Sequence, residues 1–280
     1  DRVPGMRGVL CLFEGVCSAA ADAYGRMRGT PASTLLHLGP GLANGLANFH
    51  NARKARTPLV NIVGEHSTGH LRYDAPLTAD VAAFARTVSG WVGTPESAER
   101  MGGAAAECVA AALKPPGQVA TLIVPADYSW SRGGAPGTPL PCPARNVPAG
   151  ERIREAARRL RSGEPAGLVL GGAALRERPL EAAGRIAAAT GARVYADRYC
   201  ARIERGAGRF APEKIAYFPE PATAMLAGVR NLILVETNPP VSFFGYPNQR
   251  SEVAPENCEF YALASAEEDG AAALEALAGE

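Results

Sequence analysis

Short apolar runs alternate with longer stretches of helical periodicity along the whole chain. In the first half, the runs of strand length are Val9–Phe13, Ser33–Leu38, Pro58–Gly64, Thr87–Val92 and Val119–Val124. Helical spacing of apolar residues connects them over residues 16–28, 42–55, 79–85 and 95–113. Strands that are apolar without alternation are typical of parallel sheets covered by helices on both faces. The pattern therefore predicts a doubly wound parallel α/β domain.

The same alternation returns in the second half of the chain. Helical patterns over residues 151–161, 179–190 and 267–277 alternate with strand-like runs over residues 167–170, 192–196, 231–235 and 260–263. Between the halves, residues 131–150 contain five prolines and four glycines, a composition that does not pack as a helix or strand. We therefore predict two parallel α/β domains, over residues 1–130 and 151–280, joined by a linker over residues 131–150.

The composition excludes several classes of protein. The 280 residues carry a formal net charge of +1, which gives no electrostatic reason to expect binding to nucleic acid or to an anionic membrane. No apolar run is long enough to cross a bilayer, and no basic-then-apolar signal opens the chain. The six cysteines lack any Cys-x-x-Cys spacing, so we expect them to be reduced and mostly buried. Together these features favour a cytoplasmic protein.

Glu14 stands where the first apolar run changes into the first helical pattern. One interpretation is an acid at a helix N-terminus, stabilised by the helix dipole. The other is a carboxyl group of raised pKa that shares a proton with a bound ligand. Arg26 and Arg28 suit the other end of this helix, and Gly29 is expected to end it in the left-handed conformation.

The residues around Glu14 resemble a known family. Phe13-Glu14-Gly15, followed by Ala20-Ala21-Asp22-Ala23-Tyr24-Gly25-Arg26, is similar to the activating-glutamate segment of thiamine-diphosphate enzymes. The similarity is greatest to the acetolactate synthase large-subunit-like group, which includes benzoylformate-decarboxylase-type relatives. It implies that Glu14 hydrogen-bonds the pyrimidine ring of the cofactor and activates it. Leu232–Pro247 resembles the central domain of the same group, so the resemblance covers nearly the whole chain.

The segment Gly39-Pro40-Gly41-Leu42-Ala43-Asn44 is expected to form a loop between a strand and a helix, where glycines let the backbone approach a ligand closely. It resembles the Gly-Pro-Gly loop of the family. The resemblance implies that Gly39, Pro40, Gly41 and Asn44 lie against the cofactor pyrimidine and the partner subunit.

Two other interpretations of this segment stay open. Gly39, Gly41 and Gly45 approximate a dinucleotide fingerprint, with Glu65 as the acid that would hold a ribose. On that alternative the chain is an NAD(P)-binding oxidoreductase module. The simplest alternative is a tight turn at a helix start with no ligand.

His66 and His70 follow the third apolar run, at the edge of the sheet where α/β proteins place ligands. As metal ligands they lack a third partner nearby. The resemblance implies that this loop faces the substrate, so either histidine can assist proton transfer; otherwise both are polar loop residues. His37, in a strand expected to be buried, and His50, on a helix, are expected to be structural.

The resemblance also implies cofactors and partners. It implies thiamine diphosphate with Mg²⁺, a 2-oxo acid as substrate of a carboligase or decarboxylase, and a homodimer or homotetramer. The family holds Mg²⁺ and the diphosphate with a Gly-Asp-Gly…Asn segment in a third domain, which is not recognisable here; Asp269-Gly270 lies in the last helical pattern. We therefore expect an internal fragment of a longer enzyme, lacking that domain and the first strand–helix unit and inactive alone.

Some relatives bind FAD in the central domain, and Gly171-Gly172 occupies a ligand-side position there, without specific support for FAD. A binding module without catalysis is the second class of function.

Overall fold

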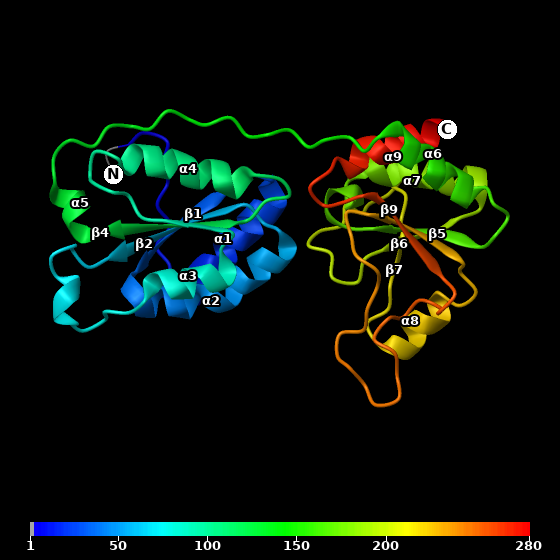
Figure 1. The fold of residues 1–280 in the computed structure, drawn as a ribbon, viewed down its shortest axis with the longest axis horizontal. Coiled ribbons are helices and arrows are strands. Elements are labelled where there is room, and N and C mark those ends of the chain that lie inside the picture. The colour runs from blue at the N-terminus through cyan, green and yellow to red at the C-terminus, as the bar shows by residue number, and fades with distance from the viewer. Residues whose placement is uncertain (1–2) are drawn as a thin grey trace. The chain divides into compact units, whose positions relative to one another are not determined.

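A computed structural model describes residues 3–280, which divide into two compact units. The first unit ends at Pro143 and the second begins at Ala144 (Figure 1). Each unit is a parallel sheet covered by helices on both faces, so the predicted fold class is confirmed.

The first unit is built on a four-stranded parallel sheet of order β1-β2-β4-β3. Its strands are β1 (Ala32–His37), β2 (Leu59–Glu65), β3 (Trp91–Gly93) and β4 (Val119–Pro125). Its helices are α1 (Glu14–Arg28), α2 (Leu38–Ala55), α3 (Val81–Val88), α4 (Met101–Leu113) and α5 (Ala126–Trp130), with a 3-10 turn η1 (Leu71–Tyr73). The central strands β2 and β4 are buried on both faces, as their unbroken apolar runs predict.

Alternate residues of the central strands pack into two separate hydrophobic cores, one on each face of the sheet. Helices α1, α2 and α3 pack on one face, against residues such as Val63 and Ile123. Helix α4 packs on the other face, against Val60, Ala120 and Leu122 (Figure 1). Helix α1 therefore lies in the same layer as α2, and this places Glu14 beside the first turns of α2.

A row of polar side chains crosses the first sheet inside this apolar layer. Asn61 on β2 is fully buried; its carbonyl accepts from Thr34 Oγ1 on β1 at 2.8 Å, and its amide donates to Thr121 Oγ1 on β4 at 3.0 Å. Thr121 in turn shares a hydrogen bond of 2.7 Å with Ser89, which precedes β3. The three strand residues are register partners, so the row fixes the alignment of the strands as well as satisfying buried polar groups.

The strand predicted over Val9–Phe13 is wrong. These residues are irregular and lead directly into α1, and the side chains of Leu10 and Leu12 are 89% and 97% exposed. Within the described residues, β1 pairs only with β2, and no strand ladder reaches this run. An apolar run of strand length forms no strand without a neighbour to complete its backbone hydrogen bonds.

Two further boundaries differ from the prediction. The helix expected from Pro95 begins at Met101, because residues 97–101 form turns in which Ser97 and Ala98 accept hydrogen bonds from Arg100 and Met101. The strand expected over Thr87–Val92 is shorter, since α3 extends through Val88 and β3 begins at Trp91.

The second unit contains a five-stranded parallel sheet of order β7-β6-β5-β8-β9. Its strands are β5 (Ala166–Leu170), β6 (Arg193–Ala196), β7 (Glu213–Lys214), β8 (Asn231–Val235) and β9 (Glu259–Ala264). Its helices are α6 (Gly150–Leu160), α7 (Glu177–Thr190), α8 (Pro219–Met225) and α9 (Gly270–Gly279), with a 3-10 turn η2 (Gly172–Leu175). The sequence pattern did not predict β7 or α8, which are too short to show a periodicity.

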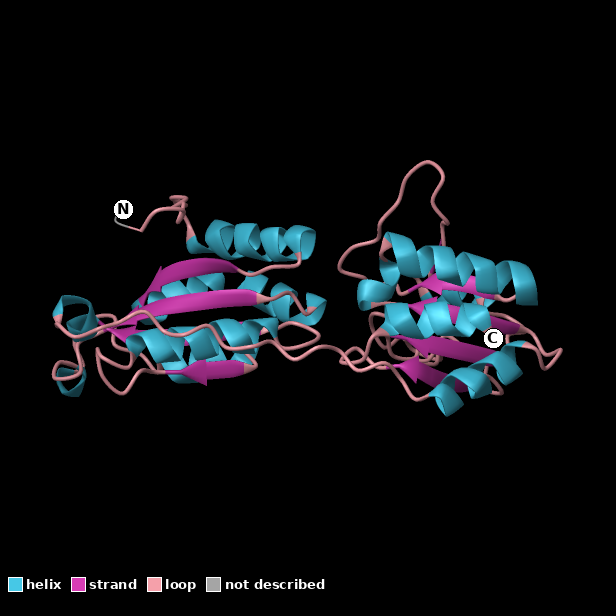
Figure 2. Cartoon of the chain, turned by 90° about the horizontal axis from the view of Figure 1, so that it is seen from above, coloured by secondary structure: helices cyan, strands magenta, loops and turns pink. Residues whose placement is uncertain are grey.

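The second sheet also separates two cores. Helices α6, α7 and α9 cover one face, which is turned toward the viewer in Figure 2, and α8 with the segment that follows β8 covers the other (Figure 1). All five strands are parallel, so their carboxyl ends lie along one edge. The residues that follow β5, β6 and β8 therefore meet at that edge.

Residues 131–149 contain no helix or strand beyond an isolated bridge between Asn146 and Glu268. The first part of this segment follows α4 so closely that a Cβ on Gly102 would lie 2.6 Å from the Gly137 nitrogen. The last part pairs with the second unit through Asn146.

The cysteines are all free thiols, but fewer are buried than the sequence predicts. Cys108 and Cys258 are buried, and Cys142 is exposed; Cys11, Cys17 and Cys200 are partly buried. Between residues 3 and 280, no helix is both long and apolar enough to cross a membrane.

We predict that Asn61→Ala lowers the free energy of unfolding by about 2 to 3 kcal/mol, because the buried Thr34 hydroxyl loses its side-chain partner and Thr121 keeps only Ser89. Urea unfolding followed by circular dichroism measures the change. Asn51→Ala, on the exposed side of α2, is the matched control and should shift stability by less than about 0.5 kcal/mol. Equal effects of the two substitutions would contradict a stabilising role for the polar row.

Candidate functional site

The carboxylate of Glu14 lies at the first turn of α1, partly buried and held by α2. Its Oε2 accepts a hydrogen bond of 3.1 Å from Asn44 Nδ2. Its Oε1 faces Gly41, where a Cβ would lie 3.7 Å away. The structure thus brings together three of the residues that the resemblance implicates: Glu14, Gly41 and Asn44.

A second amide of α2 holds the same end of α1. Asn48, one turn beyond Asn44, donates from Nδ2 to the Gly15 carbonyl at 2.8 Å. Gly15 is itself covered by the Phe13 ring, whose Cζ would lie 3.2 Å from an added Cβ. Sequence reasoning missed Asn48, although its spacing of four residues from Asn44 places both amides on one face of a helix.

The rest of the family-like segment docks α1 onto the fold. Asp22 is buried and forms a two-point ion pair with Arg26, with Nε to Oδ1 at 2.9 Å, and accepts from Thr57 Oγ1 at 2.7 Å. A Cβ on Gly25 would lie 2.8 Å from the Pro58 carbonyl oxygen. Gly29 ends the helix with φ 69°, as predicted. These residues therefore position Glu14 without being near it.

The predicted loop over Gly39–Asn44 is the first part of α2, which begins at Leu38. The turn is made by Leu38 itself, whose φ of 56° lies in the left-handed region that bulky side chains rarely adopt. Gly39 is buried because the Ala79 side chain occupies the space that a Cβ would fill, while Pro40 is exposed. Of the four residues, Gly41 and Asn44 border Glu14, and Gly39 packs away toward Ala79.

His37 was expected to be buried in a strand, and this expectation is wrong. It is exposed at the carboxyl end of β1, because β1 is an edge strand and its alternate residues are uncovered. A Cβ on Gly41 would lie 3.6 Å from His37 Cβ and 3.7 Å from Glu14 Oε1. His37 and the Glu14 carboxylate thus both lie near Gly41, and the strand pattern alone did not reveal that His37 is exposed there.

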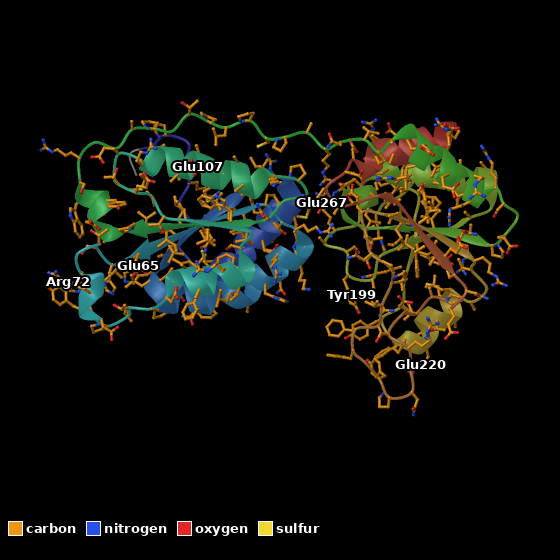
Figure 3. The ribbon with its side chains drawn as sticks, in the orientation of Figure 1. Glu65, Arg72, Glu107, Tyr199, Glu220 and Glu267 are labelled. Carbon is orange, nitrogen blue, oxygen red and sulfur yellow. The ribbon has the colours of Figure 1, made fainter. Side chains whose placement is uncertain are left out.

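The loop after β2 carries the two predicted histidines. His66 is partly buried, with Nε2 3.2 Å from the Pro76 carbonyl, and its ring centroid lies 5.4 Å from that of exposed His70. Glu65 is buried at the strand end and accepts the His66 N–H at 2.8 Å. Figure 3 shows Glu65 and Arg72 at the same end of the first unit.

Asp127 anchors this loop to the neighbouring strand end. It accepts from the Thr68 N–H at 3.0 Å and from Thr68 Oγ1 at 2.7 Å. Hydrogen bonds from Thr68 hold the pKa of the Asp127 carboxyl below its usual range. The histidines thus lie at the same sheet edge as Glu14, but in residues 3–280 no hydrogen bond joins either of them to Glu14.

Metal-ligating side chains do not gather in this unit or the other. Across the described part of the chain, no group of three or more His, Cys, Asp or Glu side chains is arranged to hold a metal ion. The first unit instead offers one carboxylate, one amide and glycine backbone at the carboxyl edge of a parallel sheet, an arrangement that suits an uncharged, hydrogen-bonding ring.

Comparison with known proteins identifies the class to which this arrangement belongs. Residues 1–84 match the thiamine pyrophosphate enzyme, N-terminal TPP binding domain family. Helix α1 and the start of α2 both lie inside this range. The first unit therefore carries a match to the N-terminal domain of this family, and the resemblance that the sequence predicts is confirmed.

Particular relatives narrow the class. The chain is 52% identical over 281 residues to the Mycobacterium tuberculosis (strain ATCC 25618 / H37Rv) protein named acetolactate synthase large subunit IlvX, covering 100% of this chain and 54% of that protein. The similarity to the acetolactate synthase large-subunit-like group is therefore confirmed. The chain spans about half the length of this relative.

Solved structures share the fold over nearly the whole chain. A Mycobacterium smegmatis protein described as a thiamin diphosphate-dependent enzyme has a TM-score of 0.83 at 22% identity, covering 97% of this chain and 55% of that one. Benzoylformate decarboxylase from Polynucleobacter necessarius has a TM-score of 0.82 at 19% identity, and the match covers 98% of this chain and 55% of that one. At these identities the likeness establishes the fold.

The geometry disfavours the alternative dinucleotide site. Gly39 is filled by Ala79, and the Glu65 carboxylate is buried against its own neighbour, so neither is free to hold a phosphate or a ribose. We predict that calorimetric titration of NAD or NADP gives no saturable binding up to about 1 mM, where the binding free energy would be near −4 kcal/mol. A stoichiometric isotherm that disappears in Glu65→Ala would make the oxidoreductase interpretation the better one.

Proposed function

We propose that this chain forms the pyrimidine-binding and central domains of a thiamine-diphosphate-dependent enzyme that acts on a 2-oxo acid as a carboligase or decarboxylase. The observation that carries the proposal is the position of Glu14, fixed by Asn44 and bordered by Gly41 at the carboxyl edge of the first sheet. On this proposal, residues 1–130 bind the pyrimidine, residues 131–150 link the domains, and residues 151–280 form the central domain.

The residues present fit the pyrimidine end of the cofactor. Glu14 Oε1 faces the backbone of Gly41, where the absence of a side chain leaves room for a flat ring. Asn44 engages only Oε2, so Oε1 stays available as an acceptor, or as a donor when protonated. Of the residues implied by the resemblance, Gly41 and Asn44 would border the ring, whereas Gly39 packs toward Ala79.

When bound, thiamine diphosphate supplies the carbanion-stabilising chemistry of this class. The role of Glu14 is to hold a proton against a pyrimidine ring nitrogen and to exchange it, which requires an ionisable carboxyl at that position. Asn44 and Asn48 fix the direction of the carboxyl, since together they tie the first turn of α1 to α2. His37, at the edge of the same site, and His66 and His70, in the neighbouring loop, are candidates to face the 2-oxo acid.

We infer further that the site is completed between two copies of the chain. Exposed apolar side chains beside Glu14 support this, since Val9, Leu10 and Leu12 are each at least 70% exposed. The Mg²⁺ and diphosphate ligands belong, on the family resemblance, to a further domain of the longer enzyme.

We predict that Glu14→Gln, in the longer enzyme that contains this chain, slows hydrogen–deuterium exchange at the cofactor thiazolium carbon by about 100-fold or more, because an amide cannot exchange the proton. Quenched-flow NMR measures the rate. Glu107→Gln, an exposed position on α4 (Figure 3), is the matched control and should leave the rate unchanged. Wild-type exchange in Glu14→Gln would remove Glu14 from the mechanism.

We also predict that the 280-residue chain alone binds thiamine diphosphate with Mg²⁺ more weakly than about 1 mM, against the micromolar affinity of a complete site, a difference of about 4 kcal/mol. The reason is that the pyrimidine contacts leave the charged diphosphate without its cation and ligands. Isothermal titration calorimetry tests this. Micromolar binding, or release of carbon dioxide from pyruvate by the chain alone, would contradict the division of the site between domains.

A further inference from the structure

A second glutamate occupies the carboxyl edge of the other sheet. Glu236 follows β8 directly, its side chain is 2% exposed, and its φ of 53° lies in the left-handed region. Its Oε2 accepts the Ala173 N–H at 2.7 Å, and its Oε1 accepts the Gly270 N–H at 3.2 Å. Arg145 Nη1 completes the set at 3.0 Å from Oε1.

Two glycines border this carboxylate, and a third borders the Glu236 backbone. A Cβ on Gly270 would lie 2.8 Å from Oε1, and a Cβ on Gly172 would collide with Oε2. A Cβ on Gly171 would lie 2.6 Å from the Glu236 carbonyl oxygen. The turn after β5 and the first residue of α9 thus form a glycine-lined nest of backbone donors, and the Glu236 carboxylate fills it.

The donors of this nest are those that an anion requires. Backbone N–H groups at a glycine turn and at the start of a helix favour negative charge, and Arg145 adds a full positive charge. Burial raises the pKa of the Glu236 carboxyl, and the opposing influences come from Arg145 and the two amides. The positive charge that Arg145 and the two amides bring to the nest is therefore already balanced by the Glu236 carboxylate.

We propose that Glu236 is a resident anion that closes the nucleotide position of the second unit, so that FAD or another nucleotide diphosphate does not bind at Gly171-Gly172. A diphosphate would need the Ala173 and Gly270 amides and the space beside three glycines, all of which Glu236 already uses. A second anion beside a buried carboxylate is also repelled by it. The residues at this edge do not fit FAD, and no step of the proposed reaction involves it.

The same carboxylate connects the linker to the second unit. Arg145 belongs to the segment that precedes α6, and the next residue, Asn146, accepts the Asp269 N–H at 2.9 Å, just before α9. Glu236 thus holds η2, α9 and the linker end at one point. This role is independent of the function proposed for the first unit, and its test can fail without affecting that function.

The test titrates FAD, ADP and inorganic pyrophosphate into the 280-residue chain at pH 8 by calorimetry. We expect no saturable binding of FAD or ADP to the wild-type chain, and at least a tenfold gain in pyrophosphate affinity in Glu236→Ala, which empties the nest. Glu252→Ala, an exposed glutamate of the same segment, is the matched control and should behave as wild type. Stoichiometric FAD or ADP binding to the wild-type chain would overturn the proposal, as would a folded Glu236→Ala chain with no gain for pyrophosphate.

A second variant covers the case in which Glu236→Ala does not fold. Glu236→Gln keeps the shape of the side chain but has only one oxygen to accept hydrogen bonds. We expect hydrogen exchange at the Ala173 or Gly270 amide to accelerate at least tenfold in this variant, measured by NMR. Unchanged exchange at both amides would show that the carboxylate does not hold the nest and would overturn the proposal.

Discussion

The first unit depends on how the N-terminal turn of α1 is held against α2. No strand precedes α1 in the described residues, so the position of Glu14 comes from side chains and not from a sheet. Asn44 and Asn48 fix the first turn, and the buried Asp22–Arg26 pair with Thr57 fixes the second half of the helix. A helix tied at both ends presents its first carboxylate in a defined direction, and this direction is what an acid–base role requires.

Glu14 in the first unit and Glu236 in the second both lie at the carboxyl edge of a parallel sheet, and they differ in what remains for a ligand. Glu14 has one neutral amide partner and is partly buried, so one oxygen stays available. Glu236 has two backbone donors and a guanidinium, and it is buried. One carboxylate is therefore open to a ligand and the other is closed, because the number of donors that converge on each of them differs.

The sequence predicts helices and strands only as far as periodicity reaches. Mostly apolar runs such as Leu59–Glu65 identify central strands because both faces are buried, and Gly29 identifies a helix end because a left-handed residue is needed there. Val9–Phe13 has the same apolar character and forms no strand, since pairing depends on a neighbour that a local pattern cannot show. Asn61 and Glu236 are polar residues whose partners lie on other elements, so their burial was not foreseeable from spacing.

In the candidate site, too, residues within a motif were predictable from the sequence, whereas exposure that depends on neighbouring elements was not. Glu14, Gly41 and Asn44 were predicted from the resemblance, and the structure brings them together. His37 was misjudged, because an apolar strand pattern does not distinguish an edge strand from a central one. Within the motif that suggested the cofactor, Asp22, Gly25 and Arg26 hold α1 in place through packing, an ion pair and a hydrogen bond from Thr57. A substitution at Asp22 would therefore act on Glu14 through the docking of α1, by loosening the helix that carries it. A chain can thus retain Glu14 and still lose the geometry that fixes the direction of its carboxylate.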